Sequence, residues 1–307
     1  MEIDNVKTYI NGIIAKFKEI EKTKNDMSEE TIEWINEITY PLYKLTDDIV
    51  ILLSDPVTKN DKIKELYHVL RKFLEIPIND EIKEQLLQNQ KCLQTLTSYI
   101  ATYDNENKEM DFSIDAFYVF IYLFSFYEFS PYLNEDCMNG LFEGLSLINE
   151  DKVLLIYVNI LIGINCDYLS EQDNMFLKVY HYHDNARVIV ETILRILNSP
   201  NEEDGMKINA LYTINTIMVQ EKKNIFYSTD LDAFIDISLS LLGSQENPVK
   251  LFTLQALENI TSYDDYFRNN YKIEELENTM ENLIYNEEDK LKEFAQNILE
   301  NIESRKN

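Results

Sequence analysis

Apolar residues recur at intervals of three and four along most of the chain, which is the period of an amphipathic helix. Segments 188–197 and 231–242 show this spacing most clearly. No segment alternates apolar and polar residues over several positions, as a half-buried strand would. The pattern therefore predicts an all-α protein.

Expected helix starts recur in two interleaved series, each with a period of roughly 40 to 46 residues. They are Asp184, Thr229 and Ile273 in one series and Asn201, Asn247 and Asn286 in the other. The tetrapeptide Leu-Glu-Asn-Ile at 257–260 also returns at 299–302. Armadillo and HEAT repeats have this length, and they stack because one repeat cannot bury its apolar face alone. The sequence predicts an armadillo/HEAT-like α-solenoid.

The first hundred residues repeat less clearly. Helices are expected near 2–23, 29–54, 58–75 and 80–103, followed by a polar loop at 104–111. We expect a single armadillo-like domain over 1–307, with an N-terminal helical cap region at 1–105 and a repeat array at 112–307. The longest apolar run, 116–126, is too short to span a bilayer and predicts a buried helix, with Phe117, Phe120, Ile121, Phe124 and Tyr127 on its core face.

Acidic residues outnumber basic ones by 55 to 28, which gives a formal net charge of −27. Such a charge repels nucleic acid and anionic lipid, and it favours encounter with a basic protein surface. Three widely spaced cysteines and an N-terminus without a basic-then-apolar leader predict a cytoplasmic location. We therefore expect a protein partner, and neither nucleic acid, membrane insertion nor a small-molecule substrate.

Catalytic and metal-binding motifs are scarce. Six glycines leave little material for a phosphate-binding loop. The pair His181 and His183, with Cys166 upstream, is the one cluster of metal-capable side chains, and such a histidine pair is common on surfaces. We predict no catalytic residue, no metal and no cofactor, so the chain is not expected to be an enzyme. An enzyme using the His181/His183 region stays open as an alternative.

The second helix series carries candidate binding residues. Asn215, Asn259 and Asn301 recur at the repeat period and are predicted to line a groove, with Gln255 and Tyr212 beside them. An asparagine amide both donates and accepts hydrogen bonds, so it can pair with the backbone of a bound peptide. The alternative is that these asparagines cap helices or lie on a solvated face.

A short segment at 224–237 has the sequence NIFYSTDLDAFIDI. Its characteristic residues are Phe226, Tyr227, Thr229, Asp230 and Leu231. Taken as local structure, the aromatic pair would pack on the preceding helix and Thr229 would cap the next one. The aspartates would favour the dipole of that helix. The motif is thus expected to be structural in its own right.

The same segment resembles the signature of the WISH/DIP/SPIN-ninety family, and the helices at 154–165 and 184–197 resemble others of its domain. This resemblance covers about 150–270. It implies a leucine-rich, armadillo-like domain that binds the Arp2/3 complex, and actin indirectly, and seeds unbranched filaments without a preformed filament. It also implies a location at the actin cortex or actin patches. Residues 1–110 match nothing in this family, and no segment of the given sequence resembles the SH3 and proline-rich regions of animal members. The alternative is an armadillo/HEAT adaptor or scaffold for a basic peptide or protein.

Overall fold

The computed structural model describes residues 44, 46–55, 58, 60–74, 80–103, 113–167, 174–220, 227–244, 247–262, 271–287 and 289–306. Every regular element in these residues is a helix, and none of them forms a strand. The chain divides into two compact units, Met1–Val153 and Leu154–Asn307. The predicted all-α fold of the armadillo/HEAT type is confirmed, while the expectation of a single domain stays a prediction.

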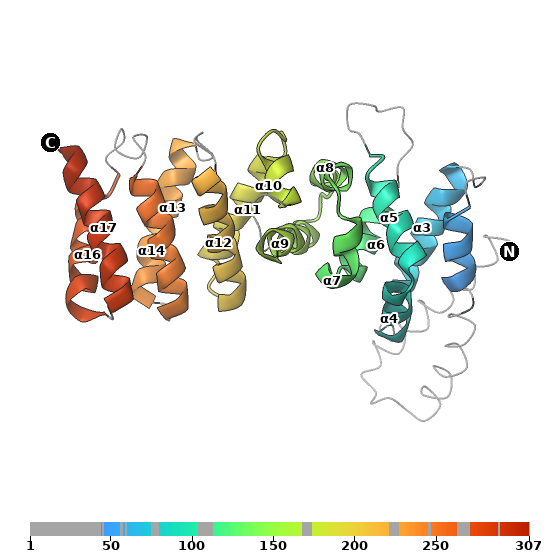
Figure 1. Cartoon of the computed structure of the whole chain (residues 1–307), viewed down its shortest axis with the longest axis horizontal. Coiled ribbons are helices and arrows are strands. Elements are labelled where there is room, and N and C mark those ends of the chain that lie inside the picture. The colour runs from blue at the N-terminus through green and yellow to red at the C-terminus, as the bar shows by residue number, and fades with distance from the viewer. Residues whose placement is uncertain are drawn as a thin grey trace, which may run out of the picture. The chain divides into compact units, whose positions relative to one another are not determined.

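The first unit contains seven described elements besides the helical residues 46–53 (Figure 1). They are α3 (Asn60–Leu74), α4 (Asp80–Gln88), α5 (Gln90–Ile100), α6 (Asp115–Leu123), α7 (Phe126–Phe129), the 3-10 turn η1 (Ser130–Tyr132) and α8 (Glu135–Gly144). Helix α3 lies against α6, and α5 contacts α4, α6 and α8. Helix α5 is therefore the centre of this unit.

The single helix expected at 80–103 is wrong, because the chain breaks at Asn89. The backbone of Asn89 leaves the helical region (φ −87°, ψ 88°), and its side chain accepts a hydrogen bond from the N–H of Cys92. An asparagine in this position accepts a hydrogen bond from an otherwise unpaired N–H of the new helix. This bond compensates for the backbone hydrogen bonds that are lost where the first helix ends. Asn134 and Asn174 cap α8 and α10 in the same way.

Aromatic residues fill the core of the first unit. Phe117, Phe120 and Phe129 are fully buried, and the rings of Phe120 and Phe129 meet edge to face with centroids 5.1 Å apart. The predicted core face was wrong at Tyr127, which is 87% exposed. The reason is that α6 ends at Leu123 and the extended ψ of Phe124 (125°) turns the chain before α7.

Helix α8 approaches its neighbours through two glycines. A Cβ atom at Gly140 would lie 2.1 Å from the carbonyl oxygen of Ile100, and one at Gly144 would lie 2.5 Å from the ring of Phe117. Real Cβ atoms do not come this close, so only glycine permits the contact of α8 with α5 and α6. The Gly-xxx-Gly spacing of the sequence is a packing device here.

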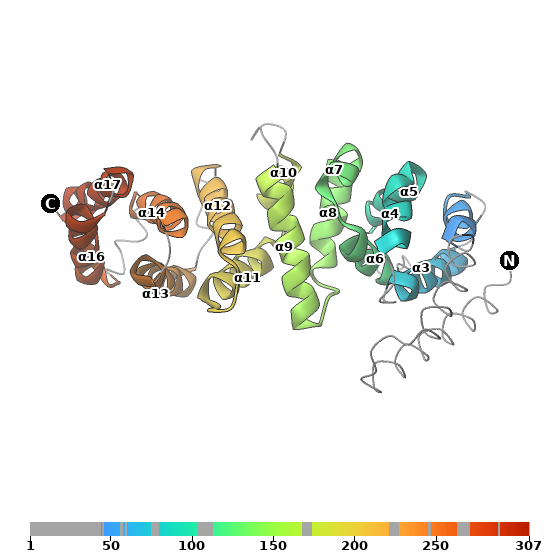
Figure 2. The ribbon, with the colours of Figure 1, turned by 90° about the horizontal axis from the view of Figure 1, so that it is seen from below.

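The second unit is built from two layers of helices (Figure 2). We call α11 (Ala186–Asn198), α13 (Ser228–Ser244) and α16 (Ile273–Asn286) the A layer. The B layer consists of α12 (Asp204–Gln220), α14 (Asn247–Thr261) and α17 (Asp289–Lys306). Helix α12 packs on α14 and α14 on α17, while each B-layer helix also packs on the A-layer helix before it. This is the stacked helix-pair arrangement of an α-solenoid.

The predicted helix starts of both layers are confirmed to within three residues. The returning tetrapeptide occupies equivalent positions, since Leu257 and Ile260 on α14 and Ile302 on α17 are all buried. Two further helices of this unit, α9 (Asp151–Asp167) and α10 (Met175–Tyr180), precede the layers, and hydrogen bonds from α9 join it to α12. The repeat pattern of the sequence therefore reflects real stacking.

Some expectations concern residues outside the described part of the chain. These are the helix near 2–23, most of the helix near 29–54, the loop at 104–111 and Phe226. Among the described residues, no helix combines the length and apolar character needed to cross a bilayer.

Candidate functional site

The solvent-facing side of the B layer, which we call the B face, carries all five predicted binding residues. Gln255 lies half-buried near the middle of the exposed side of α14, and Tyr212 is 36% exposed on α12. Asn215, Asn259 and Asn301 are half-buried, one on each of the three helices. Because each helix presents the same face, the repeat brings together side chains that lie about 42 to 44 residues apart in sequence.

Asparagine side chains connect α12 and α14 along the surface line where the two helices meet, which we call a seam. Nδ2 of Asn259 donates to Oδ1 of Asn215 over 3.2 Å, and Nδ2 of Asn215 donates to the carbonyl oxygen of Phe252 over 3.4 Å. The amides therefore bond to one another across neighbouring repeats. A hydrogen bond of this kind contributes about 1 kcal/mol to stability.

A second amide pair bridges the seam between α14 and α17. Nδ2 of Asn297 donates to Oε1 of Glu258 over 2.8 Å. Nδ2 of Asn301 donates to the carbonyl oxygen of Glu258 (3.4 Å) and to Oγ1 of Thr261 (3.3 Å). Neither Glu258 nor Asn297 was predicted as a site residue from the sequence. The spacing of Asn297 one turn before Asn301 could have indicated Asn297, because it places both asparagines on the same side of α17.

The predicted asparagine ladder thus exists as a spatial row, and part of its hydrogen-bonding capacity holds the repeats together. The alternative reading of these residues as helix caps is not what the structure shows for Asn215 and Asn259, since both lie inside helices. Their role toward a partner, and that of Gln255 and Tyr212, stays a prediction.

A buried polar cluster supports the start of the B layer. Asn165 on α9 is fully buried and donates to the hydroxyls of Thr213 (3.1 Å) and Thr216 (3.4 Å) on α12. Its Oδ1 accepts from Nδ2 of Asn174 over 2.8 Å, while Oδ1 of Asn174 caps α10. Buried amides need such partners, because an unpaired one costs free energy. The cluster fixes α9 and α10 against α12.

The 224–237 segment forms the start of α13 and its described residues have structural contacts. The carbonyl of Tyr227 accepts from the N–H groups of Asp230 and Leu231, and the Asp230 carboxylate accepts from the Tyr227 N–H. Tyr227 is therefore the cap, and the expectation that Thr229 caps this helix is wrong because Thr229 already lies in the first turn. Leu231 is buried and Thr229 is exposed.

Tyr227 also contacts the neighbouring A-layer helix. It is 60% exposed, and the guanidinium of Arg187 on α11 lies 3.8 Å above the centre of its ring. Arg187 pairs with Glu191 at 2.6 Å and approaches Asp230 at 4.0 Å, and the hydrogen bond to Glu191 is the main reason that the pKa of Arg187 is raised. These contacts join α11 to α13.

Asp236 joins α13 to α16 in a similar way. It accepts a hydrogen bond from the Tyr271 hydroxyl at 3.0 Å and pairs with the Lys272 ammonium at 3.0 Å. The hydrogen bond to Asp236 raises the pKa of both Tyr271 and Lys272. The ammonium group of Lys272, at the start of α16, is therefore already paired within the repeat array.

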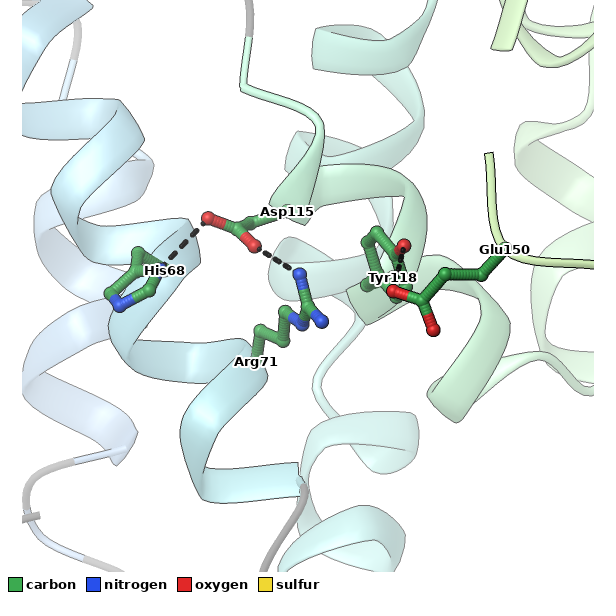
Figure 3. A network of polar contacts seen from close by, with 5 residues as sticks. All are labelled: His68, Arg71, Asp115, Tyr118 and Glu150. Carbon is green, nitrogen blue, oxygen red and sulfur yellow. Dashed lines mark hydrogen bonds and ion pairs between the residues drawn. The ribbon is translucent and has the colours of Figure 1, made fainter. Parts of the chain in front are cut away.

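The first unit holds a polar network that joins α3 to α6 (Figure 3). The Asp115 carboxylate, in the first turn of α6, pairs with His68 (3.0 Å) and Arg71 (2.8 Å) of α3. The Arg71 guanidinium lies 3.6 Å above the ring of Tyr118, whose hydroxyl donates to Glu150 at 3.4 Å. Burial, followed by the charge of Glu150, raises the pKa of Tyr118. The network contains no nucleophilic serine or cysteine, so it connects helices and assembles no catalytic triad.

The remaining candidates for chemistry serve local structure. Nδ1 of His183 accepts from the N–H of Asn185 (3.1 Å) in the turn before α11, and burial lowers its pKa. Burial raises the pKa of the Cys166 thiol to about 11, which disfavours the nucleophilic thiolate. Within the described residues, no three His, Cys, Asp or Glu side chains are grouped as metal ligands.

Comparisons with known proteins return designed repeat proteins. No protein-family model and no curated protein matches the chain. One similar solved structure is an engineered protein from a structural genomics consortium, with 17% identity, 84% of this chain and 96% of that chain covered, and a TM-score of 0.40. Another is a designed armadillo repeat protein in complex with the peptide (KR)4, with 13% identity, coverage of 83% and 98%, and a TM-score of 0.39. No functional conclusion follows from likenesses of this size.

Proposed function

We propose that this chain is a non-enzymatic scaffold that holds a segment of another protein on the B face. The observation that carries this proposal is the row of half-exposed amides and Tyr212 on three consecutive stacked helices. Such a row presents hydrogen-bonding groups at the spacing of the repeats, so it suits an elongated partner better than a compact small molecule.

Selection from a displayed library of random twelve-residue peptides tests the proposal. Selected peptides are then measured against the wild type, Gln255→Arg on the B face and Asn278→Arg on the exposed side of α16 in the A layer. Both substitutions add one positive charge, so they are matched. We expect Gln255→Arg to weaken binding at least tenfold and Asn278→Arg to change it less than twofold. Equal effects, or no selected peptide, would overturn the proposal.

A second candidate function is activation of the Arp2/3 complex, in the cytoplasm at actin patches or the actin cortex. The specific observation in its favour is the 224–237 segment, with its resemblance to the WISH/DIP/SPIN-ninety family. The chain would act without chemistry, by binding the active arrangement of the complex more tightly than the inactive one.

Actin assembly followed by pyrene fluorescence tests this second candidate. Purified Arp2/3 complex, actin and this protein are mixed without preformed filaments or another promoter. A dose-dependent shortening of the lag, with unbranched filaments under the microscope, is the expected result. An unchanged lag, with a complex that another promoter activates, would exclude activation and leave the scaffold proposal intact.

A further inference from the structure

Exposed tyrosines recur along the edge at which the A-layer helices begin. Tyr182, Tyr227 and Tyr271 lie shortly before α11, α13 and α16, at intervals of 45 and 44 residues. Tyr182 and Tyr227 are 59% and 60% exposed, and Tyr271 is half-buried. We call these three residues the tyrosine row. A single exposed tyrosine is ordinary, but a set that returns with the repeat presents aromatic surface along the whole array.

Two of these tyrosines are held in place by the preceding A-layer helix. The guanidinium of Arg187 on α11 covers one face of the Tyr227 ring, at 3.8 Å from its centre. The Tyr271 hydroxyl donates to the carboxylate of Asp236 on α13 at 3.0 Å. The two rings are therefore oriented before any partner binds, which lowers the entropy that binding would cost.

The tyrosine row also carries an excess of negative charge. At each of two consecutive steps, one cation is shared by two carboxylates. The groups are Arg187 with Glu191 (2.6 Å) and Asp230 (4.0 Å) at one step, and Lys272 with Asp236 (3.0 Å) and Glu275 (3.2 Å) at the next. Each step thus keeps one surplus negative charge beside a tyrosine, which favours a partner with positive charge at the same interval.

We propose that the tyrosine row binds a proline-rich segment of another protein, with lysine or arginine between the prolines. Such a segment adopts the polyproline II conformation, which advances about 9.3 Å in each turn of three residues. Helices packed in one layer lie about 8 to 10 Å apart, so a proline at every third position meets one tyrosine per repeat. Aromatic side chains suit this partner because the polyproline II helix is already formed and loses little entropy on binding.

Other peptide conformations match the tyrosine row less well. On one face of a β-strand the side chains are about 6.6 Å apart, so a strand falls out of step with the repeats. An α-helix is about 10 Å wide and binds in a groove, whereas the tyrosine row is an edge of single rings. The row belongs to the A layer, so this surface is additional to the B face and does not depend on the proposed function.

Fluorescence anisotropy with a labelled peptide of four Pro-Pro-Lys repeats tests the inference. Its control peptide has four Ala-Ala-Lys repeats, which keep the length and the charge but remove the prolines that fix the polyproline II conformation. At about 150 mM salt, where diffuse attraction is screened, we expect the proline peptide to bind about tenfold more tightly. Equal affinities of the two peptides would overturn the proposal.

Tyrosine variants test whether the peptide lies on the tyrosine row. Tyr182→Ala and Tyr227→Ala are each expected to weaken binding of the proline peptide about fivefold, with circular dichroism checking that the helices remain. Tyr285→Ala is the matched control, because it removes an 83% exposed tyrosine of α16 that is outside the row. It is expected to weaken binding less than twofold. Equal effects of all three substitutions would contradict the tyrosine row as the binding surface.

A variant of the B face separates this inference from the proposed function. Gln255→Arg is expected to leave binding of the proline peptide within about twofold of the wild type, because Gln255 is on the B layer. If Gln255→Arg weakens binding and the tyrosine variants do not, the peptide lies on the B face. The tyrosine row is then wrong, whereas the scaffold proposal stands.

Discussion

Helices meet by different means in the two units. Around α5, α6 and α8 the contact is apolar, with aromatic rings that meet edge to face and with glycine placed directly against backbone. Along α12, α14 and α17 the core also contains buried threonines, and each seam ends at the surface in a side-chain amide that bonds across it. In the first unit, the contacts that fix the helix positions lie in the core. The second leaves ordered polar groups exposed, which is what a binding face requires.

The largest loss of stability is expected at Gly140, where α8 lies directly against the backbone of α5. Gly140→Ala places a methyl group 2.1 Å from the Ile100 carbonyl, so α8 must move away from α5. We expect a loss of about 3 kcal/mol in the free energy of unfolding. Chemical denaturation followed by circular dichroism measures it, and hydrogen exchange assigns the loss to the first unit.

Gly163→Ala is the matched control in the second unit. No atom lies within 4 Å of a Cβ at Gly163, which sits in the interior of α9. Alanine should stabilise the helix there by about 0.5 to 1 kcal/mol. A similar loss at both glycines would contradict the contrast drawn between the units.

The next effect concerns the buried cluster beneath the B layer. Asn165→Ala removes the partner of Asn174 and of two threonine hydroxyls, all of them buried. Losing these buried hydrogen bonds should cost about 2 to 3 kcal/mol in denaturation experiments. Asn209→Ala, an exposed asparagine on α12, should stay within about 0.5 kcal/mol of the wild type. A cost for Asn209→Ala equal to that for Asn165→Ala would argue against burial as the cause.

Hydrogen bonds across an exposed seam should contribute less to stability than those of the buried Asn165 cluster. Asn259→Ala removes the donor to Asn215, and we expect a loss of about 1 kcal/mol in the free energy of unfolding. A double-mutant cycle with Asn215→Ala should give a coupling energy of about 0.5 to 1 kcal/mol. Strictly additive losses would mean that the amide pair does not connect the repeats.

Removing the Ser238 hydroxyl, in the A layer, should increase stability, whereas the substitutions in the seams should decrease it. Its hydroxyl is fully buried on α13, and no group of the described chain pairs with it. Ser238→Ala should therefore raise the free energy of unfolding by about 1 kcal/mol. A decrease of that size would show that the hydroxyl has a partner.

The smallest effect is the pH response of His183. Burial holds its pKa below 6.5, so the folded state favours the neutral ring, whose Nδ1 accepts from Asn185. The resulting stability is present above pH 6.5 and is lost as the pH falls through the lowered pKa. Thermal unfolding at pH 7.5 and 5.5 should show a smaller pH-dependent loss for His183→Gln than for the wild type. The exposed neighbour variant His181→Gln should keep the wild-type loss.

The fold was largely predictable because it depends on periodicity. The three-and-four spacing and the returning Leu-Glu-Asn-Ile fix which helix faces are buried, and stacking follows from those faces. The break at Asn89 and the exposure of Tyr127 were not predictable, since each depends on one local backbone change inside an apolar pattern.

The site was predictable only in outline. The recurrence of Asn215, Asn259 and Asn301 placed them in one row, but which groups they bond depends on the offset between neighbouring helices. Glu258 and the Asn165 cluster became visible only when helices distant in sequence were brought together. Pairing across a seam is a tertiary property that one segment of sequence does not contain.

The most direct test of the B face as a binding surface is site-specific photo-crosslinking to a library-selected, labelled peptide. A benzoylphenylalanine is placed at position 255 on α14 in one sample and at position 278 on α16 in another. We predict a crosslink from position 255 that excess unlabelled peptide abolishes, and none from position 278. A specific crosslink from position 278 alone would contradict the account and place the binding surface on the A layer.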